Sequence, residues 1–142
     1  MEILNIAIIL FIIMELANVI ILFFKPDFKY GNSVSVFKDY KESTKSNRTF
    51  INYLTSWVAS VKLIFIFQLL VILFFDNLLL KQLTVCVMIL SISVYFFRLH
   101  GIIKKLDNSG RIEPAGYSKT LDLMIIGILV CFISSLVISF GV

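Results

Sequence analysis

Apolar residues dominate four windows of the chain, and each window is about as long as a membrane-spanning helix. The windows cover residues 3–24, 54–75, 78–97 and 121–140. A helix of about 20 residues crosses about 30 Å of hydrocarbon. The pattern therefore predicts an all-α integral membrane protein with four transmembrane helices in an up-down bundle. Residues 1–142 are then a single four-helix transmembrane domain.

The overall composition supports a membrane protein over a soluble one. Hydrophobic residues make up 59% of the chain and charged residues 15%, and the mean hydropathy is +0.98. Soluble domains are about half apolar and about a quarter charged. No basic residue precedes the first window, and it ends at Lys25-Pro26 without a small-residue cleavage site, so we expect a retained helix and not a signal peptide. The expected location is the cell membrane, plasma or inner.

The basic residues predict how the chain is oriented. Of the thirteen Lys and Arg residues, only Lys62 and Lys81 lie outside the two loops at residues 25–53 and 98–120. Because cytoplasmic loops carry an excess of Lys and Arg, both loops are expected in the cytoplasm and both termini outside, N-out and C-out. Anionic lipid headgroups are the expected partners of these loops. Nucleic acid is not expected, since no soluble basic domain is present.

Several residues of these two loops are candidates for contact with lipid headgroups. They are Lys38, Arg98, His100, Lys104 and Lys105. Aromatic residues of the first loop, Phe28, Tyr30, Phe37 and Tyr40, are expected to dip into the interface, with a docking surface as the alternative. After residue 97 the apolar spacing stays helical as far as Leu106, which predicts an amphipathic extension of the third helix.

A carboxylate in the middle of the first window, Glu15, is the leading candidate for function. An ionisable group at mid-membrane depth is costly and needs a partner. Asn18 shares its helix face, and Lys62 on the second helix can reach it, so we expect a Glu15–Lys62 pair with Asn18 as hydrogen-bond partner. Two interpretations stay open. The pair can fix the register of the helices, or it can load and release a proton or cation.

The fourth helix carries small residues at every fourth position, namely Gly127, Cys131, Ser135 and Ser139. Such a stripe favours close helix packing within the bundle or between subunits. Near the start of this helix, Ser118 or Thr120 is the expected cap, and Asp122 is expected in the first turn, where a carboxylate suits the helix dipole.

No catalytic or metal-binding motif is apparent. His100 has no carboxylate or cysteine cluster near it in the sequence, so no metal site is expected. The two cysteines, Cys86 and Cys131, lie inside predicted spans without a CxxC motif, which favours packing over redox chemistry. We expect no cofactor. A protein without enzymatic activity is favoured over an enzyme.

Glu15 resembles the single glutamate midway along the first helix of small multidrug-resistance transporters, which also have four helices. The first loop here is far longer and the charge bias stronger, so the resemblance covers the position of the glutamate alone. Glutathione-using membrane enzymes of the eicosanoid family are similar in length and helix number. The second helix here lacks the arginine and asparagine–glutamate cluster of a glutathione clamp.

Three functions are consistent with this pattern. The first is ion- or proton-coupled transport or conduction centred on the Glu15/Lys62 pair. The second is a non-enzymatic membrane subunit or assembly partner that uses the small-residue stripe and the basic loops. The third is a lipid-handling membrane enzyme, which would need a cavity facing the cytoplasmic leaflet. A homo-oligomer is expected, because four helices alone offer little interior volume for a pathway, and another membrane protein is the alternative partner.

Overall fold

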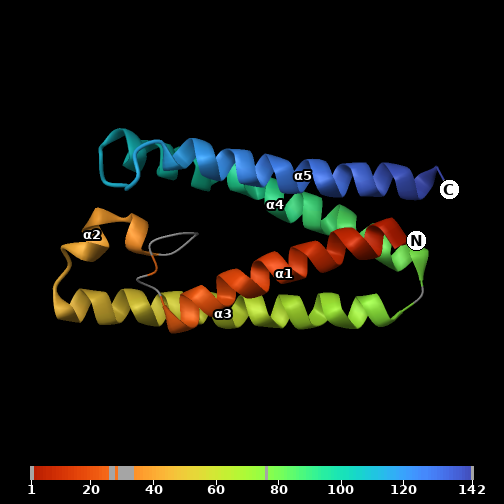
Figure 1. The fold of residues 1–142 in the computed structure, drawn as a ribbon, viewed down its shortest axis with the longest axis horizontal. Coiled ribbons are helices and arrows are strands. Elements are labelled where there is room, and N and C mark those ends of the chain that lie inside the picture. The colour runs from red at the N-terminus through yellow and green to blue at the C-terminus, as the bar shows by residue number, and fades with distance from the viewer. Residues whose placement is uncertain (1, 26–27, 29–33, 76, 142) are drawn as a thin grey trace.

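Four long helices account for most of the chain (Figure 1). The structure is a computed structural model and describes residues 2–25, 28, 34–75 and 77–141. The long helices are α1 (Glu2–Phe24), α3 (Lys45–Phe74), α4 (Leu78–Asn108) and α5 (Tyr117–Phe140), with the short η1 (Val34–Val36) and α2 (Lys38–Lys41) between α1 and α3. All four are long and apolar enough to cross a membrane. The predicted four helices are confirmed, and they indicate a membrane protein.

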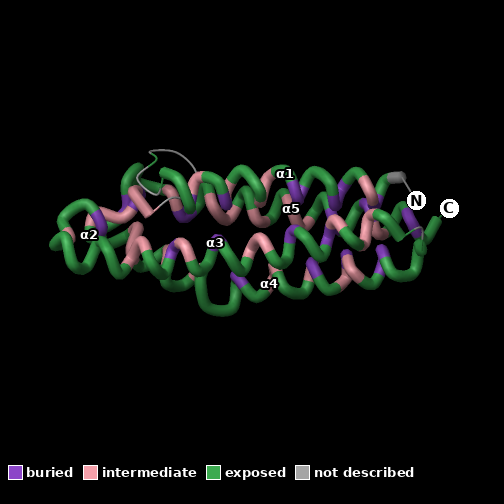
Figure 2. The backbone as a smooth tube through the Cα atoms, turned by 90° about the horizontal axis from the view of Figure 1, so that it is seen from below, coloured by how far each residue is buried: buried purple, intermediate pink, exposed green. Residues whose placement is uncertain are grey.

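The long helices alternate in direction along the bundle. Both termini and the link from α3 to α4 lie at one end of the molecule, and α2 and the turn from α4 to α5 lie at the other (Figure 1). Buried residues lie mainly on the sides of the helices that face one another, and the outer faces are exposed (Figure 2). An apolar outer face is typical of a helix bundle that lipid surrounds.

The first helix, α1, holds the bundle together. It packs most extensively on α3 and also contacts α5 and α4, while α3 and α4 contact each other little. Leu4, Ile8 and Phe11 of α1 are among the most buried side chains of the core. The second and third long helices, α3 and α4, thus pack on α1 more than on each other. Their antiparallel order is as expected.

The second long helix, α3, begins earlier than the apolar window indicates. It starts at Lys45 and not at residue 54, because Thr44 caps it: the Thr44 hydroxyl accepts a hydrogen bond from the Asn47 N–H at 3.4 Å. The nine extra residues before position 54 add about 14 Å of polar helix at the end of the bundle that carries α2. Hydropathy alone cannot detect such an extension.

The turn between α4 and α5 is compact and is organised by Asp107. The amphipathic extension is confirmed, since α4 runs to Asn108. The Asp107 carboxylate accepts hydrogen bonds from the N–H groups of Gly116 and Ser118 and from the Ser118 hydroxyl. Gly116, at φ 84°, precedes the first residue of α5. The Ser118 N–H in the first turn of α5 is thus satisfied by a residue of α4, and the N-cap residue is Gly116 and not Ser118 or Thr120 as expected.

Asp122 does not lie in the first turn of α5. The helix begins at Tyr117 and its first turn holds no acidic residue, so the expected interaction of Asp122 with the helix dipole was wrong. The helix starts four residues before the apolar window because Asp107 supplies the cap. Asp122 is placed instead for contacts with α4, described below.

The two loops at the α2 end are joined to each other. Phe37 and Ile112 form an antiparallel bridge, in which the Lys38 N–H donates to the Arg111 carbonyl at 2.9 Å and the Glu113 N–H to the Val36 carbonyl at 2.8 Å. The expected position of Tyr40 in the lipid interface was wrong, because Tyr40 is 2% exposed and its hydroxyl donates to Asn52 Oδ1 at 2.8 Å. Tyr30, of the same expectation, lies outside the described residues.

Candidate functional site

The structure brings Glu15 of α1 and Lys62 of α3 into direct contact. The Lys62 ammonium donates to Glu15 Oε2 at 2.7 Å. The two side chains are 19% and 31% exposed, and the helices that carry them pack through Ala59 and Ile66 of α3. Lys62 therefore points toward the carboxylate in the partly buried space between α1 and α3.

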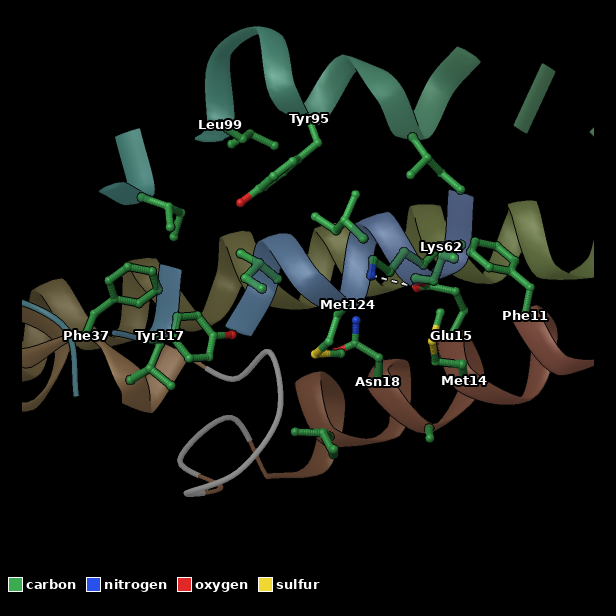
Figure 3. Close-up of a pocket in the computed structure, with 18 residues that line it drawn as sticks. Phe11, Met14, Glu15, Asn18, Phe37, Lys62, Tyr95, Leu99, Tyr117 and Met124 are labelled. Atoms are coloured by element: carbon green, nitrogen blue, oxygen red, sulfur yellow. Dashed lines mark hydrogen bonds and ion pairs between the residues drawn. The ribbon is translucent and has the colours of Figure 1, made fainter. Parts of the chain in front are cut away.

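Asn18 lies one turn after Glu15 on α1 and faces the same region (Figure 3). Its Oδ1 atom is buried and has no hydrogen-bond partner among the described residues. A buried carbonyl oxygen without a donor is unfavourable, and a water molecule or a bound ligand can supply one. Asn18 thus offers an acceptor beside the Glu15–Lys62 pair.

All three residues line a cavity of about 550 Å³ inside the bundle (Figure 3). Its deep end is formed by Phe11, Glu15 and Lys62, and its other end by Phe37 and Tyr117 near the joined loops. The remaining walls are mostly apolar side chains: Met14, Ile21, Val36, Ile92, Leu99, Ile103, Leu121, Met124, Ile125 and Ile128. This volume lies in the range of sites for small organic molecules, which are typically apolar with a few polar groups that orient the ligand.

A second polar cluster, absent from the sequence expectations, lies beside the cavity where α4 packs on α5. The Tyr95 hydroxyl donates to Asp122 Oδ1 at 2.8 Å, and His100 Nδ1 lies 2.9 Å from the same oxygen. Tyr95 also lines the cavity. His100, which has no carboxylate or cysteine cluster near it in the sequence, thus lies beside one carboxylate in the fold. His100 precedes the turn at residues 109–116 and Asp122 follows it, so the antiparallel pairing of α4 and α5 brings the two side chains together.

The same hairpin is closed at its other end by a buried glutamine. Gln82 Nε2 lies 3.2 Å from Ser139 Oγ and 3.4 Å from the Ser139 carbonyl. Next to it, Lys81 is also buried, at 1% exposed. Asn5 of α1 adds another buried Oδ1 that has no partner among the described residues. Polar groups therefore lie inside both ends of the bundle.

The small residues of α5 are divided between two environments. Ser135 and Ser139 are buried, and Gly127 and Cys131 are exposed. A Cβ atom added at Gly127 would meet nothing within 4 Å. Close packing within one chain therefore involves the second half of the stripe.

The candidate headgroup residues all lie at the α2 end of the bundle. Arg98, Lys104 and Lys105 are exposed on α4. His100 is engaged with Asp122, and Lys38 lies 3.7 Å from Glu113 Oε1. The structure therefore leaves three of the five candidates, all on α4, exposed to solvent or lipid.

Glu113 ties the first loop to the turn between α4 and α5. Lys41 Nζ donates to Glu113 Oε2 at 2.7 Å. This hydrogen bond and the positive charge of Lys41 lower the pKa of the Glu113 carboxyl below its ordinary value of 4.5. The contact joins two segments that both line the cavity. The first loop contributes Phe37, and the turn from α4 to α5 leads to Tyr117.

Neither a metal centre nor a known relative assigns a function to these groups. Within residues 2–25, 28, 34–75 and 77–141, no three His, Cys, Asp or Glu side chains come together as a metal site would require. Comparison of the chain with known protein families, with curated proteins and with solved structures gives no match. The function is therefore inferred from the geometry of the site.

Proposed function

We propose that the protein moves a proton or a small cation, or a solute coupled to one, across the membrane through the cavity. Glu15 is the binding group, Asn18 its hydrogen-bond partner and Lys62 the counter-charge. The observation that supports this proposal is the 2.7 Å contact between Glu15 and Lys62 on the wall of a cavity of about 550 Å³.

A buried charge pair such as Glu15 and Lys62 responds to the arrival of a third charge. Burial disfavours each isolated charge, and pairing offsets that cost. A proton that binds Glu15 removes the partner of Lys62, and a cation that enters the cavity competes with Lys62 for the carboxylate. The unpartnered Oδ1 of Asn18 is a second acceptor for such a cation. Protonation of Glu15 and the entry of a cation both weaken the ion pair between α1 and α3, so binding is coupled to helix packing.

The proposed orientation places the α2 end of the bundle in the cytoplasm. The exposed basic side chains of that end include Arg98, Lys104 and Lys105, and Lys62 and Lys81 are the basic residues within the spans. By the positive-inside rule both termini are then outside. Arg98, Lys104 and Lys105 would meet anionic headgroups of the cytoplasmic leaflet of a plasma or inner membrane.

Ion flux into vesicles tests the proposal. The protein is reconstituted into liposomes that contain a pH-sensitive or a sodium-sensitive dye, and a potassium diffusion potential is imposed with valinomycin. We expect faster proton or sodium entry than in protein-free vesicles, and a Glu15→Gln variant that falls to the protein-free rate. Glu42→Gln is the matched control, because Glu42 is an exposed acid outside the cavity. Parent flux equal to that of protein-free vesicles, or to that of Glu15→Gln, contradicts the proposal.

A second function, the binding of a lipid chain by a lipid-handling enzyme, is favoured by one feature of the cavity. Its end near the joined loops is lined by apolar and aromatic residues, among them Phe37, Tyr95 and Tyr117, and it lies at the proposed cytoplasmic end. Mass spectrometry of lipids retained on the purified protein tests this function. A single lipid class that is retained by the parent and lost on Ile125→Trp, which fills the cavity, would favour it over ion movement.

A further inference from the structure

Gln68 lies on the face of α3 that is turned away from the rest of the bundle. The opposite face carries the buried residues Ala59, Ile66 and Leu69, whereas Gln68 is exposed. Among the residues that the structure describes, the Gln68 side chain makes no hydrogen bond. Gln82, the other glutamine, is buried and hydrogen-bonded to Ser139. Gln68 therefore needs a partner that the described part of one chain does not provide.

The position of Gln68 within the span makes its need for a hydrogen-bond partner strong. It lies six residues beyond Lys62 on α3, about 9 Å farther along the helix, and seven residues before Phe75. Lipid tails cannot form hydrogen bonds, so an amide at this depth lacks both donors and acceptors. Serines in the spans differ, because a hydroxyl can bond to its own helix, as Ser60 does to the Ser56 carbonyl at 3.0 Å.

Gln68 belongs to a regular seam along α3. Seam residues are spaced alternately four and three positions apart, as in helices that pair side by side. The seam consists of Trp57, Val61, Ile64, Gln68 and Val71, all of them exposed. A second series of the same spacing, which includes Ala59, Lys62 and Ile66, faces α1 on the other side of the helix.

We propose that this seam is the interface of a parallel homodimer in which the two Gln68 carboxamides hydrogen-bond to each other. Two copies inserted in the same orientation place identical residues at the same depth, so a two-fold axis normal to the membrane sets Gln68 opposite Gln68. A carboxamide carries both a donor and an acceptor, so each satisfies the other. A different membrane protein would have to supply both groups at that same depth.

This interface is independent of the proposed transport function. Lys62 and the cavity lie on the side of α3 that faces α1, and the seam lies on the opposite side. Pairing through the seam therefore leaves the cavity within each chain unchanged. It also differs from the small-residue stripe of α5, where Gly127 and Cys131 are exposed.

Disulfide crosslinking in liposomes tests the proposal. In a background with Cys86→Ala and Cys131→Ala, we expect the single substitutions Gln68→Cys and Ile64→Cys to form covalent dimers on oxidation with copper phenanthroline. Val87→Cys is the matched control, because Val87 is 60% exposed at a similar depth on α4. The native Cys131, in a Cys86→Ala protein, reports an interface on α5. Crosslinking at Val87→Cys or Cys131 but not at Gln68→Cys overturns the proposal, as does the absence of crosslinks at every position.

The contribution of the carboxamide is measured separately. Gln68→Leu preserves the shape of the seam and removes the hydrogen bonds, and we expect the dimer dissociation constant in detergent, from analytical ultracentrifugation, to rise about three- to thirty-fold. Gln68→Asn is expected to retain part of the affinity. A Gln68→Leu protein that dimerises as tightly as the parent overturns the role of Gln68.

Discussion

Lys62 Nζ lies 2.7 Å from Glu15 Oε2, although 47 residues separate the two positions along the chain. The contact joins α1 to α3, the helix on which it packs most extensively. Both side chains also line the interior cavity. One ion pair is therefore placed to serve both the assembly of the bundle and the binding of a third charge.

The first prediction concerns the stability that the pair confers. Lys62→Met leaves the Glu15 carboxylate without its partner in the interior, which we expect to lower the free energy of unfolding by up to about 3–5 kcal/mol. The double variant Glu15→Gln/Lys62→Met removes both charges and is expected to recover most of that loss. Denaturant unfolding of the three proteins in detergent, followed by circular dichroism, measures both effects.

The double variant shows whether the charges of Glu15 and Lys62 are coupled. If Glu15→Gln/Lys62→Met is as unstable as Lys62→Met alone, the two charges are not coupled and the ion pair does not contribute to the free energy of unfolding. Lys104→Met serves as the control, because Lys104 is exposed on α4 and its replacement should change the unfolding free energy by less than about 0.5 kcal/mol.

The second prediction concerns the hydrogen bonds of Asp122. Tyr95 is 9% exposed, so Asp122→Ala leaves its hydroxyl buried without an acceptor, and we expect a loss of about 1–3 kcal/mol in the same unfolding measurement. His100→Ala is expected to cost less, because the hydrogen bond from Tyr95 to Asp122 remains. An equal or larger effect of His100→Ala would contradict this ranking.

The third prediction is a pH dependence of the contact between the two loops. The pKa of Glu113 is lowered by the hydrogen bond and charge of Lys41, so the ionised form is favoured in the folded protein. A contact that depends on a lowered carboxyl pKa is present above the ordinary value of 4.5 and is lost as the pH falls through the lowered value. We therefore expect the loops to stay joined at pH 7 and at pH 5, and to separate in stronger acid.

Electron spin resonance distances between labels at Glu42→Cys and Ala115→Cys, in the cysteine-free background, measure this separation. The parent should give a narrow distribution from pH 7 to pH 5 that broadens at lower pH. Glu113→Gln should give the broad distribution at every pH. A narrow distribution in Glu113→Gln would mean that the bridge between Phe37 and Ile112 suffices to join the loops.

The four long helices were predictable because hydropathy reports them directly. The limits of α1 and the end of α5 agree with the apolar windows to within about a residue. The start of α3 was missed because Thr44 caps the helix in a polar segment. The start of α5 was missed because its cap, Asp107, comes from another helix. Capping across a turn depends on tertiary structure and leaves little trace in hydropathy.

The candidate site was only partly predictable for the same reason. Glu15 and Lys62 are conspicuous as charges within apolar windows, so depth alone suggested that they could meet. Asp122, Tyr95 and His100 are each unremarkable in sequence, and their cluster depends on how α4 and α5 align about their turn. The cavity depends on α1 lying against both α3 and α5, an arrangement that the order of windows does not specify.

The proposed transport function is tested most directly by asking whether a water-soluble cation can reach the groups that line the cavity. In the cysteine-free background, Asn18→Cys is treated in sealed liposomes with a small, positively charged methanethiosulfonate reagent. Leu16→Cys is the control, since Leu16 is 40% exposed on the same helix and does not line the cavity. We expect Asn18→Cys to react and Leu16→Cys not to react. An Asn18→Cys protein that stays unmodified, or reacts no faster than Leu16→Cys, would mean that the Glu15–Lys62 pair is a packing contact closed to ions.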